Sequence, residues 1–504
     1  MIGLTPAAAK PVMNETRGNG RGWRILRRML VGLAVFATLI AMFYTEEDWR
    51  GKRAWENYRR ELEAKGEKLD WQAFVPAPVP EDQNFFEAPI FQKLASGEIS
   101  MNFERSDGIE ASLRKGSGNW LRGTATDLKG WQIYYRNPTK PATAKEFPIA
   151  PQMQTPAADV LYALNKYDAA MEQLRQASRR PYANLPLNYA DGFNAVSPLL
   201  PDLATLKRCA RVLSLRAVAE LADGQSDQAL EDIKLLLYLD NSIRNSPFLI
   251  SQLVRIAMAS IALQPVWEGL SEHKWSDEQL AALDSELSKM DFLADYEFAM
   301  RGDRAFAIAS FENQRRTRET VAYTGDRLVT NKLTLMPSAF FYRNELEFAR
   351  LQQQWILPIV DTHSRTVSPA ACRRLEADVA AESKHYSLYK VQALASVPAV
   401  AASAEKFAFI QWALDAARVA CALERYRLAH GEYPDTLDAL APQFIAAVPH
   451  DNINGQPLHY RRTDDGKFVL YSVGWNEKDD GGQVAFKKGG VMPDQDNGDW
   501  VWKN

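Results

Sequence analysis

An uncharged, mostly apolar run of sixteen residues extends from Met29 to Tyr44 and directly follows Arg27 and Arg28. A helix of this length spans about 24 Å, which is short of the roughly 30 Å hydrocarbon core of a bilayer. Ile25 and Leu26 lengthen the apolar stretch if the two arginine side chains reach back to the headgroups. A segment of this kind predicts a transmembrane signal anchor.

Two alternatives stay open for this segment. A cleavable signal peptide usually has a shorter apolar region, and no A-x-A-like cleavage site follows Tyr44. A buried core helix is disfavoured by the arginine cluster and by the position near the N-terminus. We therefore expect an uncleaved transmembrane signal anchor at 23–45, preceded by a disordered cytoplasmic tail at 1–22.

The flanks of the apolar run predict its orientation. Arg27 and Arg28 precede it, whereas Glu46, Glu47 and Asp48 follow it. Within fifteen residues on each side the basic residues are nearly balanced, five before the run against four after it. Because cytoplasmic flanks carry the excess of Lys and Arg, we expect a single-pass protein of the inner (cytoplasmic) membrane with a large periplasmic region.

The composition is that of a globular protein with real cores. The chain has 504 residues, of which 46% are hydrophobic and 24% charged, enough for two to four domains. A net charge of -3 argues against a nucleic-acid-binding protein, which needs a basic surface. The three cysteines (Cys209, Cys372 and Cys421) form no CxxC pair and lie in helical patterns, which predicts buried free thiols.

The segment after the apolar run, 46–150, is divided into three parts. Residues 46–65 predict a juxtamembrane helix with Trp55 and Leu62 on one face. The alternating prolines of 75–80 predict a stiff, extended linker. The remainder is mixed, and its pattern indicates no topology.

Residues 151–400 predict an irregular α-helical array. Thr155 followed by Pro156 is a helix start, and Ser276 with Gln279 forms a capping box. The apolar periodicity between such signals is helical. Helices are expected at about 201–222, 227–241, 247–263, 277–289, 292–320 and 338–357.

One helix pair, near 214–240, is weakly similar to a tetratricopeptide-type hairpin. Ala217, Gly224 and Ala229 have the spacing of the small residues that let two antiparallel helices approach closely in such hairpins. No 34-residue period accompanies them, so we expect an array without repeats.

The motifs that carry catalytic chemistry are missing from the sequence. The six histidines include no two spaced three or four apart on a helix, and neither HExxH, GxSxG nor a P-loop occurs. Carboxylate chemistry leaves little trace in a sequence. We therefore expect a non-catalytic protein, with a cell-envelope hydrolase that uses carboxylates of the helical domain as the alternative.

Residues 401–504 predict a helix followed by a small antiparallel sheet. Gly431 is a left-handed C-cap and Pro434 prevents the helix from continuing. A hairpin turn at 464–466 joins two strands, the second of which covers 468–474.

From about 420 onward the chain resembles the globular domain of type II secretion system pseudopilins. The segments that carry the resemblance are a Y-R-x-x-x-G-x-Y-P-like turn at 426–434, the stretch 449–460, and the strand 468–474 with the acidic, glycine-rich loop after it. The resemblance implies an α+β module used in protein interaction or envelope assembly.

The chain also departs from the pseudopilin pattern. Its apolar run lacks the glutamate of pilins, and most of the chain separates that run from the module. Asp451, Asn452 and Ile453 stand where the usual aspartate-proline-tryptophan turn would be. We therefore expect that the chain is not processed or assembled as a pilin.

In the major pseudopilins the acidic loop binds calcium, so the resemblance implies a calcium site here. Carboxylate oxygens are the ligands that calcium takes, and a divalent cation offsets their mutual repulsion. The alternative is a solvated acidic tail. The expected ligands are Asp479, Asp480, Asp496 and Asp499.

Together these features predict a mainly α fold with an N-terminal membrane helix, an irregular helical array and a small C-terminal pseudopilin-like module. The expected function is a membrane-anchored extracytoplasmic role in protein interaction or in cell-envelope or secretion-related assembly. The expected partners are the membrane and an unidentified protein, without nucleic acid.

Overall fold

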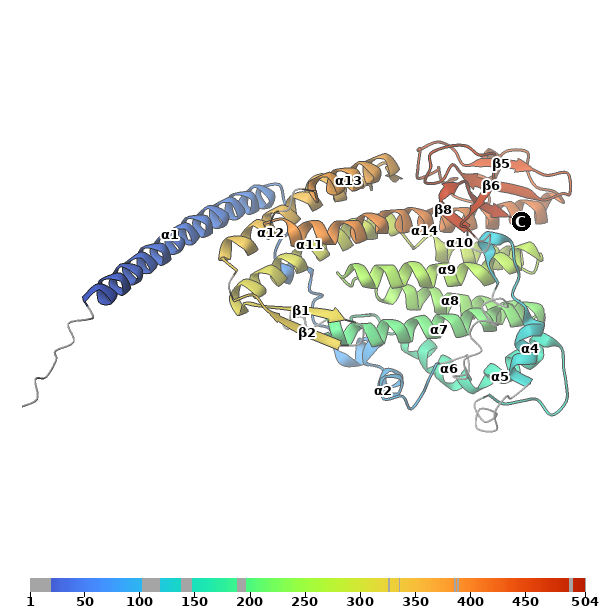
Figure 1. The fold of residues 1–504 in the computed structure, drawn as a ribbon. Coiled ribbons are helices and arrows are strands. Elements are labelled where there is room, and N and C mark those ends of the chain that lie inside the picture. The colour runs from blue at the N-terminus through green and yellow to red at the C-terminus, as the bar shows by residue number, and fades with distance from the viewer. Residues whose placement is uncertain are drawn as a thin grey trace, which may run out of the picture.

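The computed structural model describes residues 20–101, 118–136, 147–187, 196–324, 327–334, 336–384, 387, 389–488 and 493–503. This part of the chain is mainly helical with a few small sheets, as expected. Figure 1 shows an elongated body from one end of which helix α1 (Gly20–Ala64) projects, while the C-terminal strands cover the other end. Most of the tail expected at 1–22 lies outside the described residues.

Helix α1 joins the expected anchor and the expected juxtamembrane helix into one continuous element of 45 residues. From Trp23 to Tyr44 its large apolar side chains are exposed, as in a helix meant for lipid. Beyond this stretch, Trp55 and Leu62 are buried against α12 (Ser338–Leu351). A single helix thus has an exposed N-terminal part and a C-terminal part that is packed against the body.

The body is a set of packed helices around one hydrophobic core. Helix α7 packs on both α8 and α9, and α14 contacts α9, α10, α11, α12 and α13 along its 40 residues. The helices of the body are α2 (Pro89–Ala95), α4 (Leu128–Arg136), α5 (Pro156–Leu164), α6 (Asp168–Ala177), α7 (Val196–Ala222), α8 (Ser226–Ser242), α9 (Leu249–Ser271), α10 (Asp277–Leu287), α11 (Phe292–Thr317), α12, α13 (Pro369–Glu382) and α14 (Val391–His430).

Several local predictions are confirmed. Thr155 caps α5, and Ser276 with Gln279 forms the capping box of α10. Ala217 and Ala229 are fully buried where α7 meets α8, as close helix approach requires. The cysteines (Cys209, Cys372 and Cys421) are buried and free.

Other boundaries were predicted wrongly. Helix α9 runs past the expected end at 263 and through Pro265, because the buried residues that follow continue its packing. Its composition would allow a membrane span, but 56% of its most apolar 18-residue stretch is buried in the body. Helix α14 begins at Val391, ahead of the region 401–504 in which it was expected, since the Asn344 side chain on α12 accepts hydrogen bonds from its first backbone N–H groups.

The end of α11 was also misjudged. Arg318 adopts a left-handed φ of 59° and ends the helix at Thr317. An antiparallel hairpin that sequence reasoning missed follows, formed by β1 (Glu319–Thr324) and β2 (Arg327–Lys332). After α12 the chain passes through a π-helical turn at Gln352–Ile356 and the short pair β3 (Val360–Asp361) and β4 (Thr366–Val367).

The C-terminal region forms the expected small antiparallel sheet beside the end of α14. Gly431 ends α14 with a φ of 86°. The sheet order is β5-β6-β9, and Leu470 lies opposite Trp502. The strands are β5 (His459–Arg462), β6 (Phe468–Ser472), β9 (Trp500–Lys503) and a separate pair, β7 (Val484–Phe486) with β8 (Pro493–Gly498).

Candidate functional site

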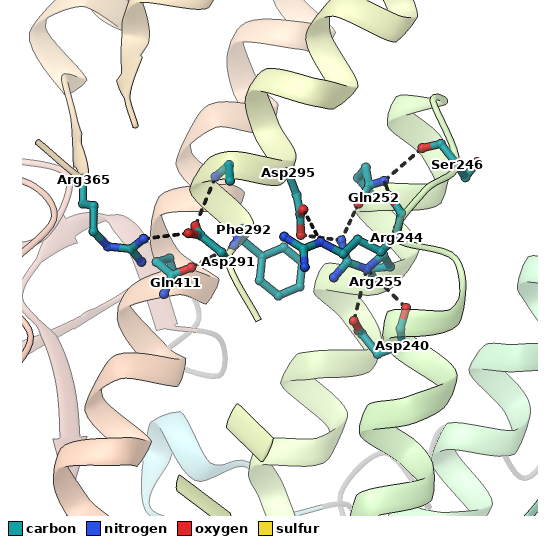
Figure 2. Close-up of polar contacts among 11 residues, drawn as sticks. Asp240, Arg244, Ser246, Gln252, Arg255, Asp291, Phe292, Asp295, Arg365 and Gln411 are labelled. Carbon is teal, nitrogen blue, oxygen red and sulfur yellow. Dashed lines mark hydrogen bonds and ion pairs between the residues drawn. The ribbon is translucent and has the colours of Figure 1, made fainter. Parts of the chain in front are cut away.

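A buried ionic cluster lies where α8, α9 and α11 meet (Figure 2). Its centre is Arg255, which is fully buried. The Arg255 Nη1 donates to Asp295 Oδ2 at 2.6 Å and to Gln252 Oε1 at 2.7 Å. Its Nε donates to Asp240 Oδ1 at 3.2 Å, and the guanidinium lies 4.8 Å from the centre of the Phe292 ring. One guanidinium thus ties three helices together.

The carboxylates of this ionic cluster are not equivalent. Burial raises the pKa of Asp240 to about 7, and neither Asp240 Oδ2 nor Arg255 Nη2 has a hydrogen-bond partner among the described residues. Asp295 also accepts from Arg244 Nε at 2.7 Å. The adjoining cavity, beside Ser246, holds about 10 Å³, which is the size of one water. The cluster therefore joins the helices of the interior.

The polar layer continues from α11 to α14, as Figure 2 shows. The Asp291 side chain caps α11 and also pairs with Arg365, whose Nη1 lies 2.7 Å from Asp291 Oδ2. The backbone N–H of Phe292 donates to Gln411 Oε1 at 2.9 Å. The N-terminus of α11 is thereby fixed to α14.

A second set of buried charges lies between α6, α7 and α8. Asp232 is fully buried and accepts from Arg216 Nε at 2.9 Å and from Arg175. Burial, reinforced by Asp232, raises the pKa of the neighbouring Glu220 to about 8. These carboxyls face arginines in the interior, whereas hydrolysis needs carboxyls that reach a substrate.

A polar surface hollow lies on the C-terminal half of α11. It measures about 350 Å³ and is lined by Ala309, Glu312, Asn313, Arg315 and Arg316. Its described lining supplies one carboxyl group. It does not bring together the two acids that a carboxylate-based hydrolase uses.

Three of the four expected calcium ligands lie at one turn of the C-terminal region. Asp499 is buried and accepts hydrogen bonds from the backbone N–H groups of Gly482, at 2.6 Å, and of Asp480, at 3.2 Å. Asp479 accepts from the Gly481 backbone N–H at 2.9 Å, and this bond lowers the pKa of Asp479. These carboxylates order the glycine-rich turn through its backbone.

The fourth expected ligand, Asp496, lies elsewhere. The tail that was expected to be a loop contains strand β8, and this strand places Asp496 against Glu405 of α14. Burial and the facing Asp496 carboxyl raise the pKa of Glu405 to about 8. Sequence reasoning missed Glu405, because no spacing signal links a helix residue to a strand so far along the chain.

Among the described residues, no group of three or more His, Cys, Asp or Glu is placed to hold a metal ion. Asp480 accepts from Asn476 Nδ2 at 2.9 Å, so one of the expected ligands already has a partner within the turn. Calcium binding at the four aspartates stays a prediction.

Asp451 is the organising residue of the C-terminal sheet region. It is fully buried, and its Oδ1 accepts from Ser472 Oγ at 2.8 Å and from the Ile453 backbone N–H at 2.9 Å. Its Oδ2 accepts from the Val473 backbone N–H at 3.1 Å. This carboxylate holds the 451–456 turn against the end of β6.

Comparison of the chain with protein-family models, with curated proteins and with solved structures finds no match. A function has to be inferred from the exposed apolar half of α1, the ionic interior and the way in which the C-terminal strands are held.

Proposed function

We propose that the chain is a membrane-anchored, extracytoplasmic, non-catalytic protein whose helical body carries the C-terminal module for protein interaction in cell-envelope or secretion-related assembly. The pseudopilin-like motifs of the module motivate the assembly role. The protein is proposed to sit in the inner membrane through one N-terminal span.

The single observation that supports this proposal most is the continuity of α1. The same helix that exposes its apolar side chains from Trp23 to Tyr44 is packed against α12 from Gly51 onward. A Cβ at Gly51 would lie 3.2 Å from the Ala339 Cα, so the two helices meet at backbone distance. A flexible tether would let the body tumble, whereas a packed helix holds it in one orientation.

The attachment of the C-terminal strands supports a displayed module. Trp502 lies 5.3 Å from Trp120, and Trp500 lies 5.8 Å from Trp412 of α14, measured between ring centres. The Trp267 Nε1 donates to the Lys503 carbonyl at 2.6 Å. The strands are therefore part of the folded body, and the body presents them at the end away from α1 (Figure 1).

The alternative is a cell-envelope hydrolase that uses carboxylates of the helical domain. Glu220 and Asp240 have the raised pKa values that general acids often have. Each is enclosed with arginines, and the α11 hollow contributes Glu312 as its one described carboxyl. These observations give the hydrolase less support than the interaction role.

Topology is the direct test. An alkaline phosphatase fused after Asn504 should be active, and a green fluorescent protein at the same position should stay dark, because the two reporters mature on opposite sides of the membrane. Removal of residues 20–45 should release the protein from the membrane fraction. Cytoplasmic reporter activity would contradict both the proposed address and the proposed role.

A further inference from the structure

The start of α12 is held against α1 close to the point where α1 would leave the bilayer. Asp48 Oδ1 accepts a hydrogen bond of 2.6 Å from the backbone N–H of Ala339, in the first turn of α12. Asp48 follows Thr45 by three residues, or about 4.5 Å along the helix axis. The headgroup layer on each side of a bilayer is roughly 5–8 Å thick. With α1 in the bilayer, α12 must begin within this layer.

A corner of the chain is tied to this end of α12. Arg318 donates from Nη1 to the Met336 carbonyl at 2.6 Å and from Nη2 to Ser338 Oγ at 2.9 Å. The Leu333 backbone N–H donates to the Arg318 carbonyl at 2.7 Å. Figure 1 shows that this corner, with the start of the β1–β2 hairpin, lies at the end of the body from which α1 projects.

The acidic residues of α1 at this level already have partners within the protein. Glu46 pairs with Arg50 and Glu47 with Arg343, each at 2.7 Å. Asp48 is occupied by the first turn of α12.

The cations of the corner are not neutralised in this way. Arg316 and Lys332 are exposed, and neither they nor Arg318 form an ion pair with another described residue. Glu319 lies opposite Lys332 in the β1–β2 hairpin, so the three cations outnumber it and leave a net positive charge at this corner.

We propose that the corner formed by Arg316, Arg318 and residues 332–334 and 336–338, here named the basic corner, docks on the anionic phospholipid headgroups around the exit of α1. The inference rests on the proposed membrane anchor and extends it, because a second contact fixes the rotation and tilt of the body. Phosphate groups fit exposed guanidinium and ammonium groups. The basic corner lies next to the membrane whether the body is on the cytoplasmic or the extracytoplasmic side.

The test uses the full-length protein in vesicles with a fluorescent label at Thr334→Cys, an exposed position of the basic corner. The native cysteines are buried, so a maleimide dye should react at the introduced thiol. Lipids that carry a nitroxide on the headgroup should quench this label. A matched label at Ser285→Cys, on the exposed side of α10, should keep its fluorescence.

Charge is tested in the same labelled protein. Arg316→Glu combined with Lys332→Glu should reduce the quenching at position 334 in vesicles of equimolar phosphatidylcholine and phosphatidylglycerol. Both side chains are exposed, so the fold should tolerate the change. Quenching at 334 that equals quenching at 285, or that ignores the charge reversal, would overturn the proposal.

A third label separates failure of the inference from failure of the anchor. Phe36→Cys lies in the exposed apolar half of α1. Quenching of this label by acyl-chain nitroxides together with an unquenched label at 334 would reject the basic corner alone. No quenching at either position would reject the anchor as well.

Discussion

At the scale of single residues, the interior of this protein contains carboxyl groups that the fold keeps neutral or pairs tightly. Glu345 on α12 is fully buried, and in the part of the chain that the structure describes neither of its carboxyl oxygens has a hydrogen-bond partner. The charged groups that face it are Arg59 on α1 and both Glu312 and Arg315 on α11. Burial, reinforced by Glu312, raises the pKa of Glu345 to about 8. An ionised form would be an uncompensated buried charge.

This carboxyl makes the stability of the protein depend on pH. Between its ordinary pKa of 4.5 and about 8, the folded state holds the proton and the unfolded state releases it. The free energy of unfolding therefore falls as the pH rises, by up to about 1.4 kcal/mol per pH unit from this group. Glu345→Gln, which resembles the neutral acid, should remove that decline. Urea midpoints from about pH 5 to pH 8 check this, and parallel curves for the two proteins would contradict it.

The buried cluster around Arg255 predicts a large effect of charge removal. Arg255→Met leaves Asp240 and Asp295 without their shared cation and should destabilise the protein by about 3–5 kcal/mol. The matched control is Arg365→Met, which breaks a partly exposed pair with Asp291 and should cost less than about 1 kcal/mol. Denaturant unfolding measures both, and equal losses would show that burial does not govern these pairs.

At the scale of elements, the helix ends that depend on nearby residues could be predicted from the sequence, whereas those that depend on distant residues could not. The start of α10 was predictable because Ser276 and Gln279 cap it locally, and the end of α14 because Gly431 tolerates a positive φ. The start of α14 was not predictable, since it depends on Asn344 from another helix. The four aspartates were grouped by sequence distance, whereas strand β8 separates Asp496 from the rest.

The calcium prediction belongs to the turn that Asp499 orders. If calcium binds to the folded state and not to the unfolded state, a free calcium concentration a hundred times Kd stabilises the protein by about 2.7 kcal/mol. The full-length protein should then melt several degrees higher in millimolar calcium than in chelator. Asp480→Ala should abolish the difference, and Asp465→Ala, in the hairpin turn between β5 and β6, should preserve it. Superimposed melting curves of the unmutated protein would leave the aspartates with a purely structural role.

At the scale of the whole molecule, the C-terminal strands and the helices share one core. Trp502 is buried, and its ring packs beside that of Trp120, which precedes the strands by most of the chain. The pseudopilin-like motifs predicted a small C-terminal module, and their sequence could not reveal this packing because its partners lie in remote segments. The body and the strands are therefore expected to unfold together.

Trp502→Ala tests this cooperation. The change should cost about 3–5 kcal/mol and should lower the stability of the helices and the strands alike. Far-ultraviolet circular dichroism and tryptophan fluorescence should then report coincident transitions. Leu428→Ala, at an exposed position on α14, is the control and should change stability by less than about 0.5 kcal/mol. Two separated transitions would show that the strands fold on their own.

The length of helix α14 sets the distance between the two ends of the body. The helix starts beside α12, at the end of the body from which α1 projects, and its 40 residues reach the C-terminal strands after about 60 Å (Figure 1). With α1 in the bilayer as proposed, the rigid helix α14 holds the strands at a fixed distance from the membrane surface. A partner held in the same membrane must be equally tall to meet them, whereas a partner from the far side of the compartment needs to cross only the remaining gap.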